Sequence, residues 1–519
     1  MRVANQKTIV TDRVAELVVE EIAKDVVQRD QAFAEACSRV RELVEKFCKG
    51  DEDFFEMTEL LWAELMALGL RAMERIWACR RQVPERHAEY DDRGRKYRYR
   101  KEKDYVLRCV FGEGSVRGSQ YVRGENARSG DEMCPQMSRI GVWSIGGAFG
   151  PKLALECAHA ASQMPFDRAK EQLERFFAYV PSKRSLMGIA DKLGPIAHEV
   201  LSSADCPQGD ALVVQLDGRG TPRISEEEYE KRCKPHQKGA EAKPRRRRNA
   251  SRYLDSKRAV GKNKTKKQEV TVAIIYALRR VDGGWEVVGD KQYFACMGDR
   301  EAVMKQVAKQ LSKLEAKPER LLFLTDGAGH YETLHKRYLP QAEHIVDYYH
   351  VCEYLWDAAA AIHGERVERI SWVRLVKSFL LEGKPELVLA MLHGGRAQIP
   401  KRGPGTKARR KTVDQAIGYI KHRRDRMPYD KLLADGLEIG SGAIESAVRQ
   451  VVELRLDGPG MRWGVDRPNR ILHLVCARLS RCWQDLEQQF RHRLRHSPEP
   501  IGRITPIGVA ERRQHRAAA

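Results

Sequence analysis

Residues 211–218 read Ala-Leu-Val-Val-Gln-Leu-Asp-Gly. The run from Ala211 to Leu216 predicts a short strand that is buried on both faces, and Asp217-Gly218 predicts its end. A second run, Leu321 to Thr325, is closed in the same way by Asp326-Gly327. Two buried strands that each end in Asp-Gly form the centre of the predicted fold.

The segments around these strands complete a mixed sheet. Residues 269–280 alternate like a strand, and the turn at 282–284 leads into a further strand at 285–289, which is a hairpin signal. An amphipathic helix from Arg300 precedes the second buried run, and a helical piece follows it. A short strand at 344–346 ends at Asp347. This order of strand, hairpin, helix, strand, helix and strand is that of an RNase H-like α+β fold, a mixed β-sheet flanked by helices.

The rest of the chain is predicted to be mainly helical. A charged, tyrosine-bearing loop is expected at 85–103, before a hairpin over 105–122, and one C-terminal helix is expected at about 470–493. The expected segments are a helical N-terminal arm (1–104), the hairpin and its loop (105–135), a helical region (136–205), the first part of the sheet domain (206–350), an all-helical insertion (351–435), the second part of the sheet domain (436–470), and a helix with a basic tail (471–519).

Residues 166–193 form a helix-turn-helix pattern. Apolar positions spaced three and four apart predict one helix that ends before Pro181, and Ser182 can cap the next. Lys183 and Arg184 lie near the start of the second helix. This pattern is compatible with a helix that reads the major groove of DNA and equally with a plain helical hairpin.

The composition favours a polyanionic partner. The 519 residues carry 93 Lys and Arg against 72 Asp and Glu, a net charge of +21. Residues 231–267 hold 16 of these cations against Glu241 and Asp255, and Arg245, Arg246, Arg247 and Arg248 are consecutive. Such a segment can bind phosphates and release their counterions. A solvent-exposed loop without a partner could have the same composition.

The chain lacks the signs of a secreted or membrane protein. No apolar run approaches the roughly 20 residues that span a bilayer, and the N-terminus lacks the apolar core of a signal peptide. The 12 cysteines contain no CxxC pair, which indicates reduced thiols. We therefore expect a cytoplasmic protein.

A third acid follows the insertion. Residues 439–445 read Ile-Gly-Ser-Gly-Ala-Ile-Glu and predict the start of a helix that runs to about Leu456. If Gly442 is the N-cap, Glu445 is at the third helical position, where it can return to its own helix start. The carboxylates of Asp217, Asp326 and Glu445 could instead converge at one sheet edge, because Asp217 and Asp326 end neighbouring strands of the predicted sheet.

Three converging carboxylates suit one kind of chemistry. Two Mg²⁺ ions, with Mn²⁺ as a possible substitute, prefer carboxylate oxygens and can activate a weak oxygen nucleophile and stabilise a leaving oxygen. Phosphodiester cleavage needs both effects. Water is the nucleophile in cleavage, and a DNA 3′-hydroxyl is the nucleophile in strand transfer.

Further residues are candidates for supporting roles. Asp347 and His350 share a helix face and could both point at the acids, or could form a buried pair. Arg449 could neutralise a phosphate or pair with Glu445. Beside Arg462, Trp463 could stack on an unpaired base or belong to the core.

The motifs resemble those of a bacterial insertion-sequence group, the DDE transposases of the ISKra family. The matching stretches are Leu216–Gly218, Thr325–Ala328, Val346–His350 with Glu353–Trp356, Ile439–Glu445, Arg455-Leu456 and Gly460–Trp463. The most specific blocks are Val346–His350 with Glu353–Trp356, and Ile439–Glu445 with the two stretches that follow it, and the resemblance covers roughly residues 105–490. The segment 231–267 is longer than the family pattern requires.

This resemblance implies a DDE triad of Asp217, Asp326 and Glu445 in an RNase H-like core, with the Asp347-x2-His350 signature seen in related groups. It implies an enzyme that cleaves and joins double-stranded DNA at the ends of its own element and in the target, as a homodimer or larger assembly near the bacterial nucleoid. An RNase H-like nuclease without strand transfer and a non-catalytic DNA-binding protein derived from a transposase are the alternatives.

Overall fold

The computed structural model describes residues 2–50, 53–81, 89–90, 96–123, 132–134, 143–144, 148–224, 266–458, 461–464 and 466–496. The chain divides into two compact units. Unit 1 comprises Met1–Val200 and Trp483–Ala519, and unit 2 comprises Leu201–Cys482. Nearly all of the segment 231–267, including Arg245–Arg248, lies outside the described residues.

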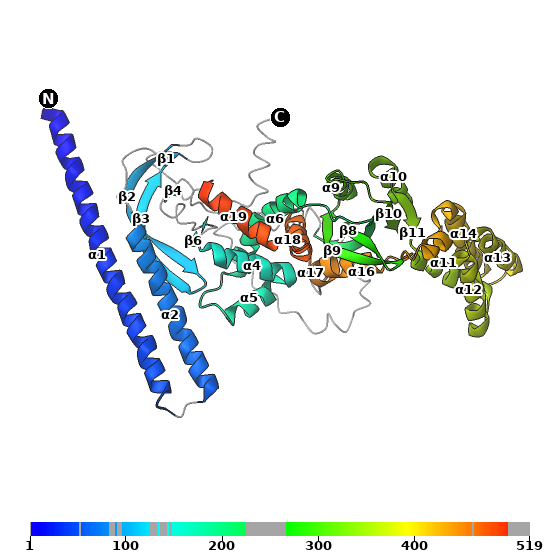
Figure 1. The fold of residues 1–519 in the computed structure, drawn as a ribbon, viewed down its shortest axis with the longest axis horizontal. Helices are drawn as coiled ribbons and strands as arrows, with labels where there is room; N and C mark the ends of the chain where they lie inside the picture. The colour runs from blue at the N-terminus through cyan, green and yellow to red at the C-terminus, as the bar shows by residue number, and fades with distance from the viewer. Residues whose placement is uncertain are drawn as a thin grey trace, which may run out of the picture. The chain divides into compact units, whose positions relative to one another are not determined.

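Two long antiparallel helices begin unit 1, α1 (Arg2–Phe47) and α2 (Phe54–Arg80) (Figure 1). Asp53 caps α2 by accepting hydrogen bonds from the amides of Phe55 and Glu56. Helix α1 is continuous, since neither glycine nor proline interrupts residues 2–47.

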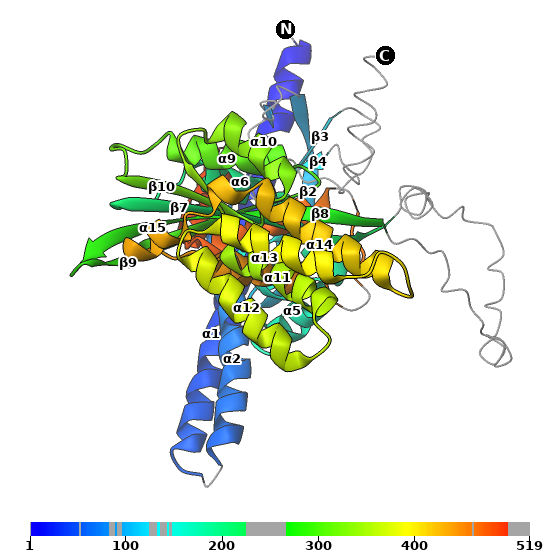
Figure 2. The ribbon, with the colours of Figure 1, turned by 90° about the vertical axis from the view of Figure 1, so that its right-hand side faces the viewer.

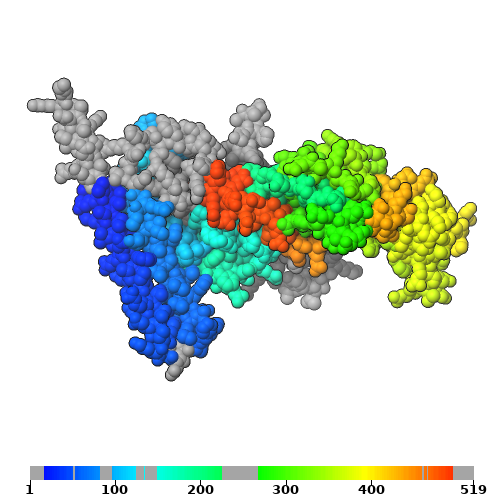
Figure 3. Space-filling model, viewed as in Figure 1, coloured from blue at the N-terminus to red at the C-terminus, as the bar shows by residue number. Residues whose placement is uncertain are grey.

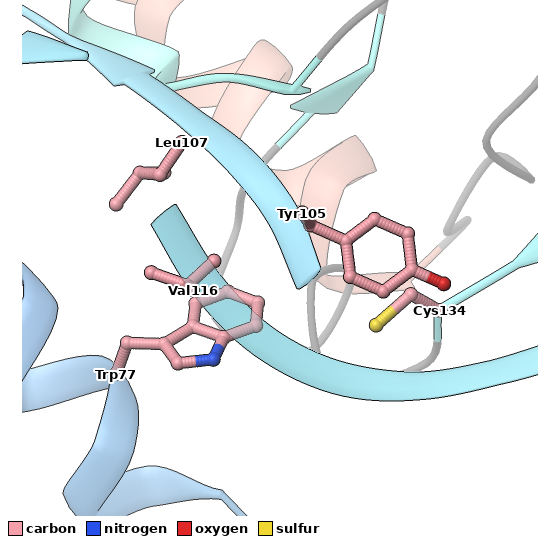
Figure 4. Close-up of a cluster of buried hydrophobic side chains, with 5 residues drawn as sticks. All are labelled: Trp77, Tyr105, Leu107, Val116 and Cys134. Atoms are coloured by element: carbon pink, nitrogen blue, oxygen red, sulfur yellow. The ribbon is translucent and has the colours of Figure 1, made fainter. Parts of the chain in front are cut away.

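A small sheet packs beside α2. It contains β1 (Glu89–Tyr90), β2 (Lys96–Cys109), β3 (Gly112–Val122), β4 (Glu132–Met133), β5 (Trp143–Ser144) and β6 (Ala148–Phe149) in the order β4-β3-β2-β6-β5, with β1 paired to β2. Figure 4 shows its core, where Trp77 of α2 meets Leu107 and Val116 of the hairpin. The Trp77 indole also donates to the carbonyl of Arg117 at 2.7 Å.

Strand β2 begins at Lys96, inside the stretch predicted as a charged loop. Tyr97 is fully buried on this strand, and Glu102 forms an ion pair with the buried Arg81 at 2.6 Å. The loop prediction is wrong for 96–103 because contacts with distant residues compensate for the charges along the strand. Local composition cannot show those contacts.

The remaining helices of unit 1 are α4 (Pro151–Gln163), α5 (Phe166–Glu174), α6 (Lys183–Ser203, which crosses into unit 2) and α19 (Trp483–His496). The predicted faces of α5 and α6 are buried, and the Ser182 hydroxyl accepts the amide of Ser185 at 3.3 Å. Helix α6 continues through Pro195, because apolar residues on both sides of the proline are buried.

Unit 2 is built on a five-stranded mixed sheet. Its strands are β7 (Ala211–Arg223), β8 (Lys266–Val281), β9 (Gly284–Met297), β10 (Arg320–Thr325) and β11 (Glu343–Val346), in the order β11-β10-β7-β8-β9. Both β7–β8 and β8–β9 are antiparallel, whereas β10 is parallel to β7 and to β11. Asp282 and Gly283 have positive φ angles, as the predicted hairpin turn requires.

Helices surround and extend this sheet. Helices α9 (Arg300–Leu311) and α10 (Gly329–Tyr338) connect its strands. The insertion is helical as predicted, with α11 (Tyr348–Ile362), α12 (Arg366–Leu381), α13 (Pro385–Gln398), α14 (Thr406–Lys421), the short η1 (Arg424–Arg426) and α15 (Tyr429–Ala434). These helices form a lobe at one end of unit 2 (Figure 3), and Figure 2 shows α11 to α14 packed together.

The chain then returns to the sheet. Helix α16 (Gly442–Val448) carries Glu445 and runs through a π-helical turn, η2 (Arg449–Glu453), into α17 (Leu454–Leu456). Helix α18 (Arg467–Leu479) closes unit 2. The single C-terminal helix predicted from the sequence is broken at Arg481, which has a φ of 60°. No helix in the described parts of the chain is long and apolar enough to cross a membrane.

Candidate active site

Asp217 and Asp326 directly follow the last paired residues of the neighbouring parallel strands β7 and β10. Leu216 is paired with Thr325, so the next positions across the two strands are Asp217 and Asp326. Adjacent strands are about 4.8 Å apart, and residues paired in this way point to the same face of a sheet. The sheet therefore brings together two of the predicted acids, which are separated by more than one hundred positions along the chain.

Each aspartate also makes a local hydrogen bond. Asp217 Oδ1 accepts the amide of Gly218 at 2.6 Å, and Asp326 Oδ1 accepts the amide of Ala328 at 2.8 Å. These bonds orient each carboxylate. Asp326 directly follows β10, but β7 does not end at Asp217-Gly218 as predicted: it continues to Arg223, because residues 217–223 remain paired with β8.

Helix α16 is attached to β7 by a buried glutamine. Gln215 is fully buried two residues before Asp217, and therefore faces the same side of the sheet. Its Oε1 accepts the amide of Ile444 at 2.9 Å. Its Nε2 donates to the Tyr276 hydroxyl at 3.1 Å and to the carbonyl of Gly440 at 3.4 Å. Gln215 thus binds the residue that directly precedes Glu445.

Asp347 links two helix starts. It is 3% exposed, and its carboxylate accepts the amides of Tyr349 and His350, which caps α11. The same carboxylate accepts the amide of Ser441, the N-cap residue of α16, at 2.9 Å. Because these three backbone amides occupy Asp347, it holds α11 and α16 together. Two arrangements were predicted for Asp347 and His350: both side chains face the acids, or the two form a buried pair. The structure shows neither, because Asp347 binds backbone amides and His350 is only half-buried.

These contacts leave Glu445 clear of the backbone amides of its own helix start. Ser441, not Gly442, is the N-cap, so Glu445 is one position beyond the predicted capping position. Its Oε1 accepts only the hydroxyl of Ser441, at 3.1 Å, among the described residues. Glu445 is exposed. Gly440, which precedes this helix, packs closely against Tyr349. A Cβ at Gly440 would lie 2.3 Å from the Tyr349 ring, so the contact requires glycine.

The pKa of Asp217 depends on the residues around it. Burial raises the pKa of Asp217 above its ordinary value, and the hydrogen bond from Gly218 lowers it. The charges of Asp326 and Glu445 raise this pKa further, whereas His350 lowers it. Such effects require the groups to be near one another. In the described residues, however, no three His, Cys, Asp or Glu side chains are placed to hold a metal ion as they stand.

His350 lies near enough to Asp217 for its charge to lower the pKa of that aspartate. Its ring lies edge-on to Tyr354 and Tyr419, with centroids at 5.6 and 6.0 Å, and its Nδ1 is 3.2 Å from Glu353 Oε2. Arg449 is exposed and makes no ion pair with Glu445. The simple pairing predicted as one alternative for Arg449 is therefore not formed.

The predicted DNA-binding residues that the structure describes differ in their burial. Trp463 is 7% exposed, and its indole donates to the carbonyl of Leu456 at 2.8 Å, so burial favours its core role. Arg462 is exposed. In unit 1, Lys183 forms an ion pair with Asp167, and Arg184 is exposed.

Sequence reasoning missed Gln215, Tyr419 and Arg423. The Tyr419 hydroxyl of α14 donates to the carbonyl of Asp326 at 2.5 Å, and Arg423 Nε donates to the carbonyl of Gly327. A signal existed for Gln215, because it is the one polar residue inside an otherwise apolar strand. No local signal marks Tyr419 or Arg423, which reach the site from the insertion.

Comparisons with known proteins add little. No protein-family model matches the chain, and no curated protein matches it. A similar solved structure is the Drosophila P element transposase strand transfer complex, at 9% sequence identity and a TM-score of 0.20. The similarity covers 70% of this chain and 85% of that one. At this TM-score it decides neither the fold nor the function.

Proposed function

We propose that unit 2 is an RNase H-like catalytic core and that the protein is a DDE-type DNA transposase of the ISKra kind. The strand order β11-β10-β7-β8-β9, with β8 antiparallel to its neighbours, supports the RNase H-like assignment. The sequence motifs support the family. The proposed substrate is double-stranded DNA, at the ends of an insertion sequence and at the target.

The observation that carries this proposal is that two of the acids follow paired residues of neighbouring strands, and that the helix of the third acid is bound to one of these strands. Asp217 and Asp326 follow the paired residues Leu216 and Thr325, and Gln215 binds the start of the Glu445 helix to strand β7. The pKa of Asp217 is raised in part by the charges of the other two. If Glu445 only capped its helix, and if Asp217 and Asp326 only formed turns, the three residues would not need to lie near one another.

The three carboxylates fit a divalent metal by their chemistry. They supply only oxygen donors, which Mg²⁺ and Mn²⁺ prefer, and the repulsion that raises the pKa of Asp217 would be relieved by a cation. When bound, two such ions supply a polarised nucleophile and stabilise charge on the leaving oxygen. Asp217, Asp326 and Glu445 are the residues that would hold them.

The proposed reaction has two steps at one site. In cleavage, the oxygen of water bonds to phosphorus, the bond to the 3′-oxygen breaks, and that oxygen leaves as a 3′-hydroxyl. In joining, this 3′-hydroxyl attacks a phosphodiester of target DNA and displaces its 3′-oxygen. The exposed side chain of Arg449, one turn after Glu445, would contact a phosphate in this proposal. Two DNA ends brought together require at least a homodimer.

The first prediction concerns the triad itself. D217N, D326N and E445Q should each lower Mg²⁺-dependent strand cleavage and joining by at least about a hundredfold, because each removes a ligand charge that the reaction requires. DNA affinity should remain close to that of the wild type. The measurement uses the full chain with labelled duplex DNA that carries the sequences flanking the gene, and gel assays follow cleavage and joining.

The outcomes separate the alternatives. Undiminished processing by any of the three variants would mean that the site is wrong. Cleavage by the wild type without joined product would favour a nuclease, and DNA binding without processing would favour a binding protein. Inverted repeats in the DNA that flanks the reading frame would support the transposase.

A further inference from the structure

The end of α14 packs directly on the loop that follows Asp326. Tyr419 and Arg423 bind the carbonyls of Asp326 and Gly327. Gly327 has a φ of 77°, and a Cβ there would lie 2.9 Å from the Tyr419 hydroxyl and 3.0 Å from Arg423 Cδ. The close approach therefore depends on glycine. It brings Arg423 of the insertion to the edge of the acidic cluster, which we define as Asp217, Asp326 and Glu445.

Arg423 differs from the arginines beside it. Arg424 pairs with Glu386 at 2.8 Å, and Arg426 pairs with Glu332 at 3.3 Å. Arg423 pairs with no carboxylate among the described residues. Its guanidinium instead donates to the neutral carbonyls of Gly327 and Tyr419 and stacks on the Tyr419 ring at 4.2 Å. Its full positive charge is thus held in place without a neutralising partner.

The insertion holds this cation rigidly. Tyr419 stacks on Tyr354 of α11, with centroids 4.1 Å apart and planes at 18°. Near the other end of α14, Arg409 donates to the last carbonyls of α11, those of Ala361 and Ile362, and Arg410 donates to Ile399 at the end of α13. Arg409 and Arg410 therefore connect α14 to α11 and α13 by hydrogen bonds. These contacts position Arg423 in the absence of a ligand.

We propose that Arg423 is a DNA phosphate-binding residue that the helical insertion supplies to the active site. The proposal rests on the proposed function, and deepens it by giving the insertion a role in holding the substrate. Two of the guanidinium nitrogens, Nε and Nη1, are occupied by carbonyls, whereas Nη2 donates to none of the described residues. A DNA phosphate oxygen beside the scissile bond is an anionic acceptor that suits a half-buried, already oriented guanidinium.

A purely structural role is the competing explanation, since Arg423 also holds the Gly327 loop. The two roles differ in salt dependence. Each phosphate neutralised by a protein cation contributes about 0.9 to the magnitude of the log–log slope of DNA affinity against salt. A loop clamp contributes nothing to this slope as long as the protein folds and binds.

The experiment compares three variants of the full chain. Binding of a fluorescein-labelled DNA duplex, with Ca²⁺ in place of Mg²⁺ to prevent cleavage, is measured by anisotropy over a series of KCl concentrations. R423Q should reduce the slope by about 0.9 relative to the wild type. R423K keeps the charge but loses the Nε bond to Gly327, and should retain the wild-type slope. R424Q, the neighbouring control, should also retain it.

Each outcome bears on a separate claim. An R423Q slope equal to that of R424Q would overturn the inference and leave the proposed function standing. An equal loss of slope in R423K and R423Q would overturn it too, because the effect would then follow the clamp and not the charge. A wild-type affinity that does not depend on salt would contradict the DNA-binding function itself. Thermal melting of each variant shows whether a lost slope reflects a lost fold.

Discussion

Asp217 carries an electrostatic cost in the folded chain. Burial is the largest cause of its raised pKa, and the charges of Asp326 and Glu445 add to it. A carboxyl whose pKa is raised by folding stabilises the folded state fully only below its unfolded pKa. That contribution is lost as the pH rises through the folded pKa. At neutral pH the ionised Asp217 therefore opposes folding, as expected of a carboxylate whose proposed metal ion is absent.

D217N should consequently stabilise the metal-free protein. Near neutral pH, in EDTA, we expect a melting temperature a few degrees above that of the wild type, since about 1 kcal/mol shifts the melting temperature of a domain of this size by roughly 2–4 °C. The difference should disappear below the unfolded pKa of an aspartate, about 4. Mg²⁺ should then raise the melting temperature of the wild type more than that of D217N. Differential scanning fluorimetry over a pH series measures all three effects.

Asp425 provides the control for this prediction. Its side chain is 95% exposed in the same unit, so D425N should leave the melting temperature unchanged. If D217N melted below the wild type at neutral pH, the repulsion that we ascribe to the acidic cluster would be absent.

Among the elements, α16 depends on a side chain from another part of the chain. Gln215 satisfies the amide of Ile444, which α16 cannot satisfy internally because it lies in the first helical turn. Q215L keeps the approximate volume but leaves this buried amide without a partner, at a cost of about 1–3 kcal/mol. The start of α16 should then move away from β7, and Glu445 with it.

We therefore expect Q215L to weaken Mn²⁺ binding several-fold, as measured by electron paramagnetic resonance of the free ion. Q310L is the matched control, because Gln310 is also fully buried in unit 2 and donates to the carbonyl of Leu201 at 2.6 Å, away from the acids. Both variants should melt at lower temperature, but Q310L should bind Mn²⁺ as the wild type does. Equal weakening in both would show that Gln215 contributes only to general stability.

The elements that the sequence predicts well are those whose pattern is local. The hairpin turn at Asp282-Gly283 needs only its own residues and is observed as predicted. The strand that begins with the apolar run before Asp217 is also observed, but it does not end at Asp217-Gly218, because residues 217–223 remain paired with β8. Strand β2 and the break at Arg481 were missed, because the first depends on Arg81 and the second has no glycine to mark its positive φ.

The candidate site follows the same division. Asp217, Asp326 and Glu445 were predicted from apolar runs that end in Asp-Gly and from a glycine-rich helix start, and the residues that precede the two aspartates, Leu216 and Thr325, are paired in the sheet. Their supports could not be found in this way. Gln215 and Ile444 are 229 positions apart, and Arg423 is 96 positions from Gly327, so only the folded chain shows that they touch.

At the scale of the whole molecule, the net charge of +21 is the main unassigned property. The acidic cluster contains none of the excess positive charge. The ion pairs of units 1 and 2 do not account for it either, because each combines one cation with one acid. The excess is densest in residues 231–267. If this excess serves DNA, affinity should fall steeply with salt, with a log–log slope of magnitude about 5–10.

Replacing Arg245–Arg248 with glutamine tests where this charge acts. If all four arginines contact phosphates, the slope should decrease by up to about 4, since each contact contributes about 0.9. Cleavage at low salt should be nearly unchanged, because these residues are not part of the acidic cluster. Anisotropy titrations in KCl and a cleavage assay under the same conditions measure the two effects. A variant that keeps the wild-type slope would mean that the segment is a solvated loop, and that the phosphate contacts lie on the folded units, where Arg423 is the first candidate.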